Sequence, residues 1–116
     1  MRTMAQKRAE FALERVLAIK SDKDKFMKFA NAAPSMILQN GFGQSMAFWL
    51  AKGTDKHLDL FDMVAKWLHL NNFIKHYDKL GTTKDLAIME QKEYLAAQNE
   101  TLAFLEWVKR FASAGL

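Results

Sequence analysis

The stretch LQNGFGQSMAFWL, residues 38–50, contains Asn40-Gly41, which by turn chemistry alone is the strongest short hairpin signal in the chain. The residues around it follow a helical period instead, and no alternating strand pattern stands on either side. The positions at steps of three and four are Ile37, Leu38, Gly41, Phe42, Ser45, Phe48 and Trp49. The periodicity therefore predicts one continuous helix from Pro34 to about Lys52.

Two glycines inside this predicted helix need an explanation, because each costs about 1 kcal/mol relative to alanine. A second apolar arc lies on the other side of the helix and leaves few polar positions, chiefly Asn40, Gln44 and Lys52. A helix that is apolar nearly all round is a buried one. We therefore expect residues 34–52 to form the central helix of the fold, with Gly41 allowing a neighbouring helix to approach closely.

The rest of the sequence also favours helices, since β-branched residues are sparse and every long segment has a period near 3.6. Further helices are expected over residues 3–20, 23–31 and 55–71, in a short segment at 72–79, and from Thr82-Thr83 to about 114 with a break near Glu90. No linker or repeat divides the chain. The sequence predicts an all-α fold, a compact bundle of about five to six helices with a buried central helix, forming a single domain over residues 1–116.

Composition excludes several classes of protein. The chain has no cysteine, which removes disulfides, thiolate nucleophiles and cysteine-based metal sites. Charges throughout the first 17 residues argue against a signal peptide, and the longest apolar run, MAFWLA at 46–51, is too short to span a bilayer. We expect a cytoplasmic protein with no membrane contact.

The positive charge is concentrated at the start of the chain. Residues 1–28 hold eight Lys/Arg against four Asp/Glu, whereas residues 29–116 hold nine of each. On the first predicted helix the core arc comprises Ala9, Ala12, Leu13, Val16, Leu17 and Lys20, and the stripe opposite it comprises Met4, Arg8, Phe11, Arg15 and Ala18, bordered by Lys7. This face suits a phosphate backbone, with Lys7, Arg8 and Arg15 contacting phosphates and Phe11 packing or stacking. The alternative is an ordinary solvated face whose cations pair with Glu10 and Glu14.

The last predicted helix has two apolar stripes. One is the core arc of Tyr94, Leu95, Leu102, Leu105, Val108 and Ala112, and the other comprises Phe104, Trp107 and Phe111. A helix with two apolar faces has two neighbours. The second stripe therefore faces either another subunit or the interior of the bundle, and the sequence leaves both open.

No residue pattern indicates catalysis, a metal or a cofactor. His57, His69 and His76 lack the spacing of a metal-ligand motif, and no nucleophile or phosphate-loop motif occurs. The junction LAKGTDKHLDL is a weak helix-turn-helix candidate, because Asp59 and Asp62 stand early in the helix that would read bases. A nuclease or other hydrolase is therefore disfavoured.

Three segments resemble a known family: MRTMAQKRAEFALERV at the start, APSMILQNGFGQSMAFWLAK in the middle and LAFLEWVKRFASAGL at the end. In this order and length they resemble the small subunit of the type III-B CRISPR effector, the Cmr complex. The likeness covers essentially the whole chain and is weakest over residues 53–90. None of the three segments is a catalytic signature.

The resemblance implies a compact helical protein without enzymatic activity. It also implies partners: other Cmr subunits including the repeated backbone subunit, further copies of the chain, and guide and target RNA, whose backbone a basic surface would contact. It favours the stripe of Lys7, Arg8, Phe11 and Arg15 as that surface, although it supplies no residue motif for RNA contact. The alternative function is a helical protein–protein adaptor with no direct nucleic-acid role, whose positive charge is incidental.

Overall fold

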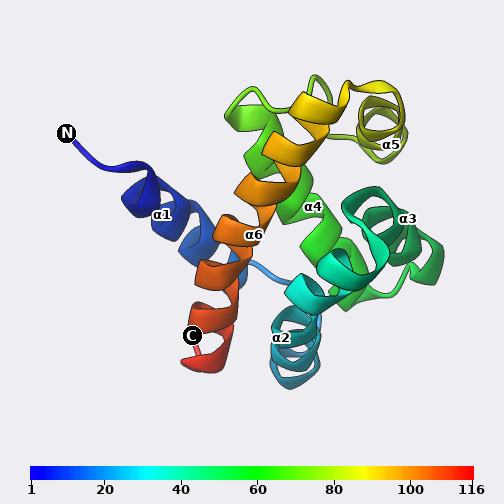
Figure 1. Ribbon diagram of the computed structural model, residues 1–116. Coiled ribbons are helices and arrows are strands. Elements are labelled where there is room, and N and C mark those ends of the chain that lie inside the picture. Colours follow the sequence, from blue (N-terminus) through cyan, green and yellow to red (C-terminus); the bar gives the residue numbers. More distant parts are fainter.

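The computed structural model describes all residues from 1 to 116 and contains six helices and no strand (Figure 1). The helices are α1 (Met4–Leu17), α2 (Lys23–Asn40), α3 (Phe42–Lys52), α4 (Asp55–Leu70), α5 (Lys79–Ile88) and α6 (Gln91–Ser113). They form a bundle with principal extents of 39 × 38 × 24 Å. The predicted all-α class is therefore confirmed.

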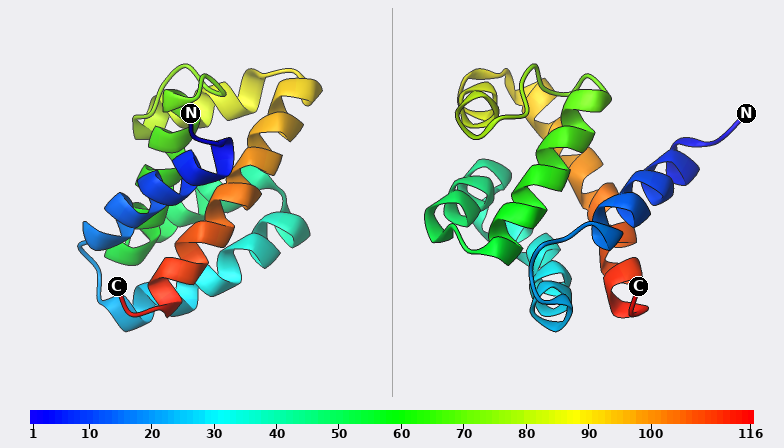
Figure 2. Two further views of the ribbon diagram at one scale, coloured as in Figure 1. Left: turned by 90° about the vertical axis from the view of Figure 1, so that its left-hand side faces the viewer. Right: turned by 180° about the vertical axis from the view of Figure 1, so that it is seen from behind.

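The most deeply buried helix is α4, and not the segment 34–52 that the sequence analysis placed at the centre. Figure 2 shows α4 running through the middle of the molecule, with α1 on one side and α3 and α5 on the other. Its side chains at the core are Leu60, Phe61, Met63, Val64, Ala65, Trp67 and Leu68, each at most 2% exposed. By contrast, α3 leaves Gln44, Ala47 and Phe48 exposed. The predicted helix was apolar enough for the centre, but only one of its faces has neighbours.

The continuous helix predicted through Gly41 is wrong, because the chain turns there. Gly41 has φ +90° and ψ 154°, a conformation that essentially only glycine adopts. Its N–H donates to the carbonyl of Ile37 and ends α2, and its carbonyl accepts from the N–H and the hydroxyl of Ser45 at the start of α3. A Cβ on Gly41 would meet nothing within 4 Å, so close packing is not its role. The close approach is at Gly43, where Tyr94 accepts a hydrogen bond of 2.7 Å from the Gly43 N–H.

The helix start predicted at Pro34 is also wrong, since α2 runs through this residue without interruption. An internal proline removes one helical hydrogen bond and costs about 3 kcal/mol. The compensation is packing, because the buried residues of α2 stand at helical spacing on both sides of the proline: Phe26, Phe29, Ala30, Ala33 and Ile37. A break at Pro34 would take Ile37 out of this row.

The short helix predicted over residues 72–79 is replaced by a loop, and α5 begins at Lys79. Asp78 caps α5 by accepting from the Gly81 N–H, so Thr82 and Thr83 lie inside the helix and are not its caps. The predicted break near Glu90 is confirmed, and the first helix begins where it was predicted, with Thr3 as its N-cap, but α1 ends at Leu17 and not at Lys20. None of the helices combines the length and apolarity that crossing a membrane requires.

Candidate nucleic-acid interface

The sequence analysis placed Arg8 in the basic stripe opposite the core, but the structure places it elsewhere. Its Nε donates to Glu100 Oε2 at 2.6 Å and its terminal Nη2 donates to Glu100 Oε1 at 2.9 Å, which ties α1 to α6. The Nε1 of Trp67, on α4, also donates to Oε2 at 2.9 Å. The side chain of Arg8 is only 22% exposed and that of Glu100 only 7%. Arg8 is thus a partner in an ion pair inside the fold, and its charge is already compensated.

The pKa values of this pair shift in the directions that favour charge on both groups. The hydrogen bond to Glu100 raises the pKa of Arg8 against the opposing effect of burial. Burial works to raise the pKa of Glu100, but hydrogen bonds from Arg8 and Trp67 and the charge of Arg8 outweigh it, so this pKa is lowered. The ion pair therefore persists across the physiological pH range.

Phe11 is not free to stack on a ligand, which corrects the second expectation for this stripe. Its ring centroid lies 5.3 Å from that of Trp67 and 5.9 Å from that of Phe104. Trp67 and Phe104 stack on each other at 5.5 Å with an interplanar angle of 12°. Three helices thus share one aromatic cluster. The predicted core arc is correct at Ala12 and Val16, the two buried residues of α1, but Leu17, also assigned to it, is 62% exposed, so the inward face is turned from the predicted one.

Lys7 and Arg15 remain the available cations among the predicted RNA contacts. Lys7 is exposed, and Arg15 is half-buried with its guanidinium 5.9 Å from the centroid of the Phe11 ring. Neither forms an ion pair within the chain, whereas Arg2 pairs with Glu10. The cationic face of α1 is therefore reduced from three residues to two.

The three aromatic residues predicted as a subunit interface have different environments. Phe104 is fully buried in the chain's own core and is unavailable to another subunit, which corrects that expectation. Trp107 and Phe111 are half-buried, with ring centroids 5.8 Å apart. The interior of the bundle thus accommodates the first residue of the stripe and part of the other two.

The three histidines lie apart, and no group of three or more potential ligands is placed to hold a metal ion. His57 packs against Phe29 with ring centroids 4.4 Å apart and shares a hydrogen bond with the Thr54 hydroxyl. His76 contacts Asp85, and His69 packs against the ring of Tyr77. Each imidazole has a packing or hydrogen-bonding role of its own.

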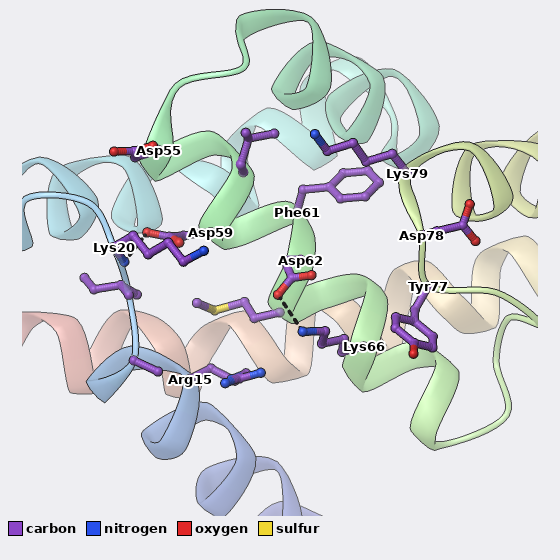
Figure 3. Close-up of a pocket in the computed structure, with 14 residues that line it drawn as sticks. Arg15, Lys20, Asp55, Asp59, Phe61, Asp62, Lys66, Tyr77, Asp78 and Lys79 are labelled. Atoms are coloured by element: carbon purple, nitrogen blue, oxygen red, sulfur yellow. Dashed lines mark hydrogen bonds and ion pairs between the residues drawn. The ribbon is translucent and has the colours of Figure 1, made fainter.

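A groove of about 480 Å³ opens between the C-terminal end of α1, the part of α4 from Asp55 to Lys66 and the loop that leads into α5 (Figure 3). Arg15 and Lys20 lie on its α1 side, and Tyr77 and Lys79 lie on its α5 side. Sequence reasoning missed three of these residues. Lys20 was assigned to the core arc, and Tyr77 and Lys79 stand in the part of the chain without a clear pattern. Only the tertiary fold brings them to one groove.

Comparisons with known proteins agree over the whole chain. The model of the family described as CRISPR-associated protein (Cas_Cmr5) matches residues 4–115. The CRISPR system Cmr subunit Cmr5 of Thermus thermophilus is 31% identical over 116 residues, covering 98% of this chain and 96% of that protein. The subunit of the same name from Thermotoga maritima is 29% identical over 115 residues, covering 95% of this chain and 82% of that protein.

A solved structure extends this likeness to three dimensions. The crystal structure of a CRISPR-associated Cmr5 family protein from Thermus thermophilus superposes with a TM-score of 0.81 at 31% sequence identity, covering 98% of this chain and 97% of that one. Sequence and fold thus match along the same residues, including the segment 53–90 where the sequence resemblance was weakest. The chain therefore belongs to the Cmr5 family of CRISPR-associated proteins, which confirms the resemblance to the Cmr small subunit.

Proposed function

We propose that the chain is a non-catalytic small subunit of a type III-B CRISPR ribonucleoprotein. In this proposal several copies stack along the guide–target RNA duplex, beside the repeated backbone subunit, and a basic face of each copy contacts the RNA backbone. Membership in the Cmr5 family supports the place in the complex. The proposed setting is the cytoplasm.

The observation that supports RNA contact is the state of the cations in the first quarter of the chain. Of its eight Lys/Arg, three form ion pairs with carboxylates: Arg2, Arg8 and Lys28. The eighth, Lys23, donates to the Leu116 carbonyl oxygen at 3.0 Å, and the other four have no such partner and point to the surface or its edge: Lys7, Arg15, Lys20 and Lys25. Cations without partners in the chain are the groups that release counterions when they meet phosphates. Lys7 and Arg15 therefore stay in the proposed interface, and Arg8 leaves it.

A salt titration of target-RNA binding tests this function. Complexes reconstituted with and without the chain should differ in the slope of log K against log salt, because each phosphate contact adds roughly 0.7 to 0.9 to its magnitude. The double variant Lys7→Gln, Arg15→Gln should bind with a shallower slope than Lys75→Gln, Lys92→Gln, which loses the same charge from exposed positions elsewhere. Equal slopes with and without the chain would contradict the proposal, as would nuclease turnover by the isolated protein supplied with divalent metal.

The second candidate function, a helical adaptor without RNA contact, is favoured by exposed apolar side chains. Ile88 is 81% exposed, Leu38 69% and Leu80 63%. Trp107 and Phe111 add a half-buried aromatic pair on α6, which we propose as part of a subunit interface. If the chain is such an adaptor, omitting it should disrupt assembly of the complex but leave the salt slope of RNA binding unchanged.

A further inference from the structure

The Asn40-Gly41 pair at the junction of α2 and α3 has a chemical reactivity that the proposed function does not use. The backbone nitrogen that follows an asparagine can attack the side-chain amide, and glycine favours this attack because it has no Cβ to obstruct the ring that forms. The other asparagines precede residues that carry a Cβ: Asn31, Asn71, Asn72 and Asn99. Asn40 is therefore the asparagine of this chain that reacts fastest wherever the backbone is free to move.

The reaction needs no partner other than water. The Gly41 nitrogen bonds to Asn40 Cγ, and the amide nitrogen takes up the proton of Gly41 and leaves as ammonia, which closes a cyclic imide. Water then opens the ring at either carbonyl, and the product is aspartate or isoaspartate. Asn40 is exposed at the last position of α2 and lines an open depression with Gln39 and Gln44, so water reaches it. Each conversion adds one carboxylate, which lowers the formal net charge of +4 by one.

The fold opposes this attack at the backbone. The Gly41 N–H donates to the carbonyl of Ile37 at 2.8 Å, which holds the nitrogen in the last turn of α2. To bring this nitrogen onto Cγ, the chain must rotate about the Cα–C bond of Asn40, and α3 has to move relative to α2 in the same step. Phe42, the first residue of α3, is fully buried and would have to leave the core. The reaction therefore requires the junction between the two helices to open.

The start of α3 is held in place by Tyr94 of α6. The Tyr94 hydroxyl accepts from the Gly43 N–H at 2.7 Å, and its ring centroid lies 6.1 Å from that of Phe42. N–H groups in the first turn of a helix have no partner within the helix, and Gly41, which precedes α3, has no side chain to cap them. A residue of a different helix supplies the cap instead. The Tyr94 hydrogen bond is therefore a contact that opening of the junction has to break.

We propose that Asn40 is a site of spontaneous deamidation, and that the hydrogen bond between Tyr94 and Gly43 controls its rate by holding the junction of α2 and α3 closed. Local opening of a packed helix end costs more than fraying of a chain terminus and less than global unfolding. The folded chain should therefore react at Asn40 roughly tenfold to a hundredfold more slowly than the chain unfolded in urea, and still faster than at its other asparagines. Nothing in this reaction depends on RNA contact.

The test is incubation of the purified full chain at mildly alkaline pH, with the products separated by ion exchange and located by peptide mass mapping. Tyr94→Phe keeps the ring and removes the hydroxyl, so it should raise the rate at Asn40 roughly threefold to tenfold, the factor that corresponds to one hydrogen bond. The matched control is Tyr77→Phe, which makes the same change in the exposed loop before α5 and should leave the rate unchanged. Asn40→Gln keeps an amide but would have to close a larger ring, and it should stay unmodified.

A second variant separates local opening from global unfolding. Arg8→Ala removes the ion pair with Glu100, away from the junction, and should leave the rate at Asn40 unchanged although it weakens the fold. If Arg8→Ala accelerates the reaction as much as Tyr94→Phe does, the whole chain has to unfold and the proposed control by Tyr94 is overturned.

Three further outcomes contradict the proposal. Equal rates in Tyr94→Phe and Tyr77→Phe would show that the hydroxyl does not hold the junction closed. Conversion of Asn40 in the folded chain no faster than that of Asn99, which is exposed within α6, would show that Asn40 is not a preferred site. A rate in the folded chain equal to that in urea would show that the fold does not restrain the junction at all.

Discussion

The guanidinium of Arg8 and the carboxylate of Glu100 form two hydrogen bonds, of 2.6 and 2.9 Å, across 92 residues of chain. Glu100 is 7% exposed and also accepts from Trp67, so the pair joins α1, α4 and α6 at one point. Removing one partner of such a pair leaves a nearly buried charge without compensation, and this cost exceeds the value of an exposed ion pair.

We therefore expect Arg8→Ala to lower the free energy of unfolding by about 2–4 kcal/mol, somewhat less than for a fully buried pair because Arg8 is partly exposed. Lys7→Ala, on the exposed face of the same helix, should change it by no more than about 0.5 kcal/mol. Urea denaturation of the two variants provides the measurement. Equal effects would show that the ion pair contributes nothing to stability.

The lowered pKa of the Glu100 carboxylate predicts that part of the folding stability is lost in acid. Because the pKa of Glu100 is lowered on folding, its contribution is present above the unfolded pKa of about 4.5 and is lost as the pH falls below that value toward the folded pKa. Glu100→Gln removes this group, so the dependence of unfolding free energy on pH should be flatter in the variant between pH 5 and pH 3. Parallel profiles would contradict the assignment.

The lowered pKa of His57 predicts a second pH dependence of the free energy of unfolding, at higher pH than that of Glu100. Burial lowers its pKa, with further contributions from the charges of Lys56 and Lys52. Between the unfolded pKa of about 6.5 and the lower folded pKa, the unfolded state binds more protons, so the free energy of unfolding falls as the pH drops below 6.5. Replacement by phenylalanine, which suits the neighbouring Phe29 ring, should abolish this fall between pH 7 and 5.5. Thermal melting across this pH range would show the difference.

Gly41 is expected to be sensitive to substitution although a Cβ there would have open space. Alanine is strained at φ +90°, so Gly41→Ala should cost about 1–3 kcal/mol. Asn40→Ala, one residue earlier and exposed at the end of α2, should be nearly neutral. A neutral Gly41→Ala would mean that the helices join without the special backbone conformation.

Alanine substitutions at Phe104 and Phe111 should separate the contribution of core packing from the contribution to assembly. Phe104→Ala removes a fully buried ring and should destabilise the isolated protein by about 3–5 kcal/mol. Phe111→Ala, at a half-buried position, should cost clearly less, and as part of the proposed interface it should weaken incorporation into the complex. Normal incorporation of a stable Phe111→Ala variant would remove this residue from the interface.

The sequence by itself determined the class of fold, the family and those helix ends that depend on nearby residues. The start of α1 near Thr3, the extent of α4 and the break before α6 were predicted because capping, helical period and chain breaks act over a few residues. The family was recognisable because its segments extend across the whole chain.

The tertiary structure decided which side of each helix faces inward and which local signals prevail. The period of α1 placed Arg8 opposite the core, whereas Arg8 packs inward to pair with Glu100, which is far away in sequence. At Pro34 the helix continues, because Ile37 packs in the core. At Gly41 the turn signal is stronger than the helical period, and the helix ends. The groove of Lys20, Tyr77 and Lys79 had no signal in the sequence. Contacts between distant segments carry the free energy that settles such choices, and a local pattern does not specify which distant segment will be the neighbour.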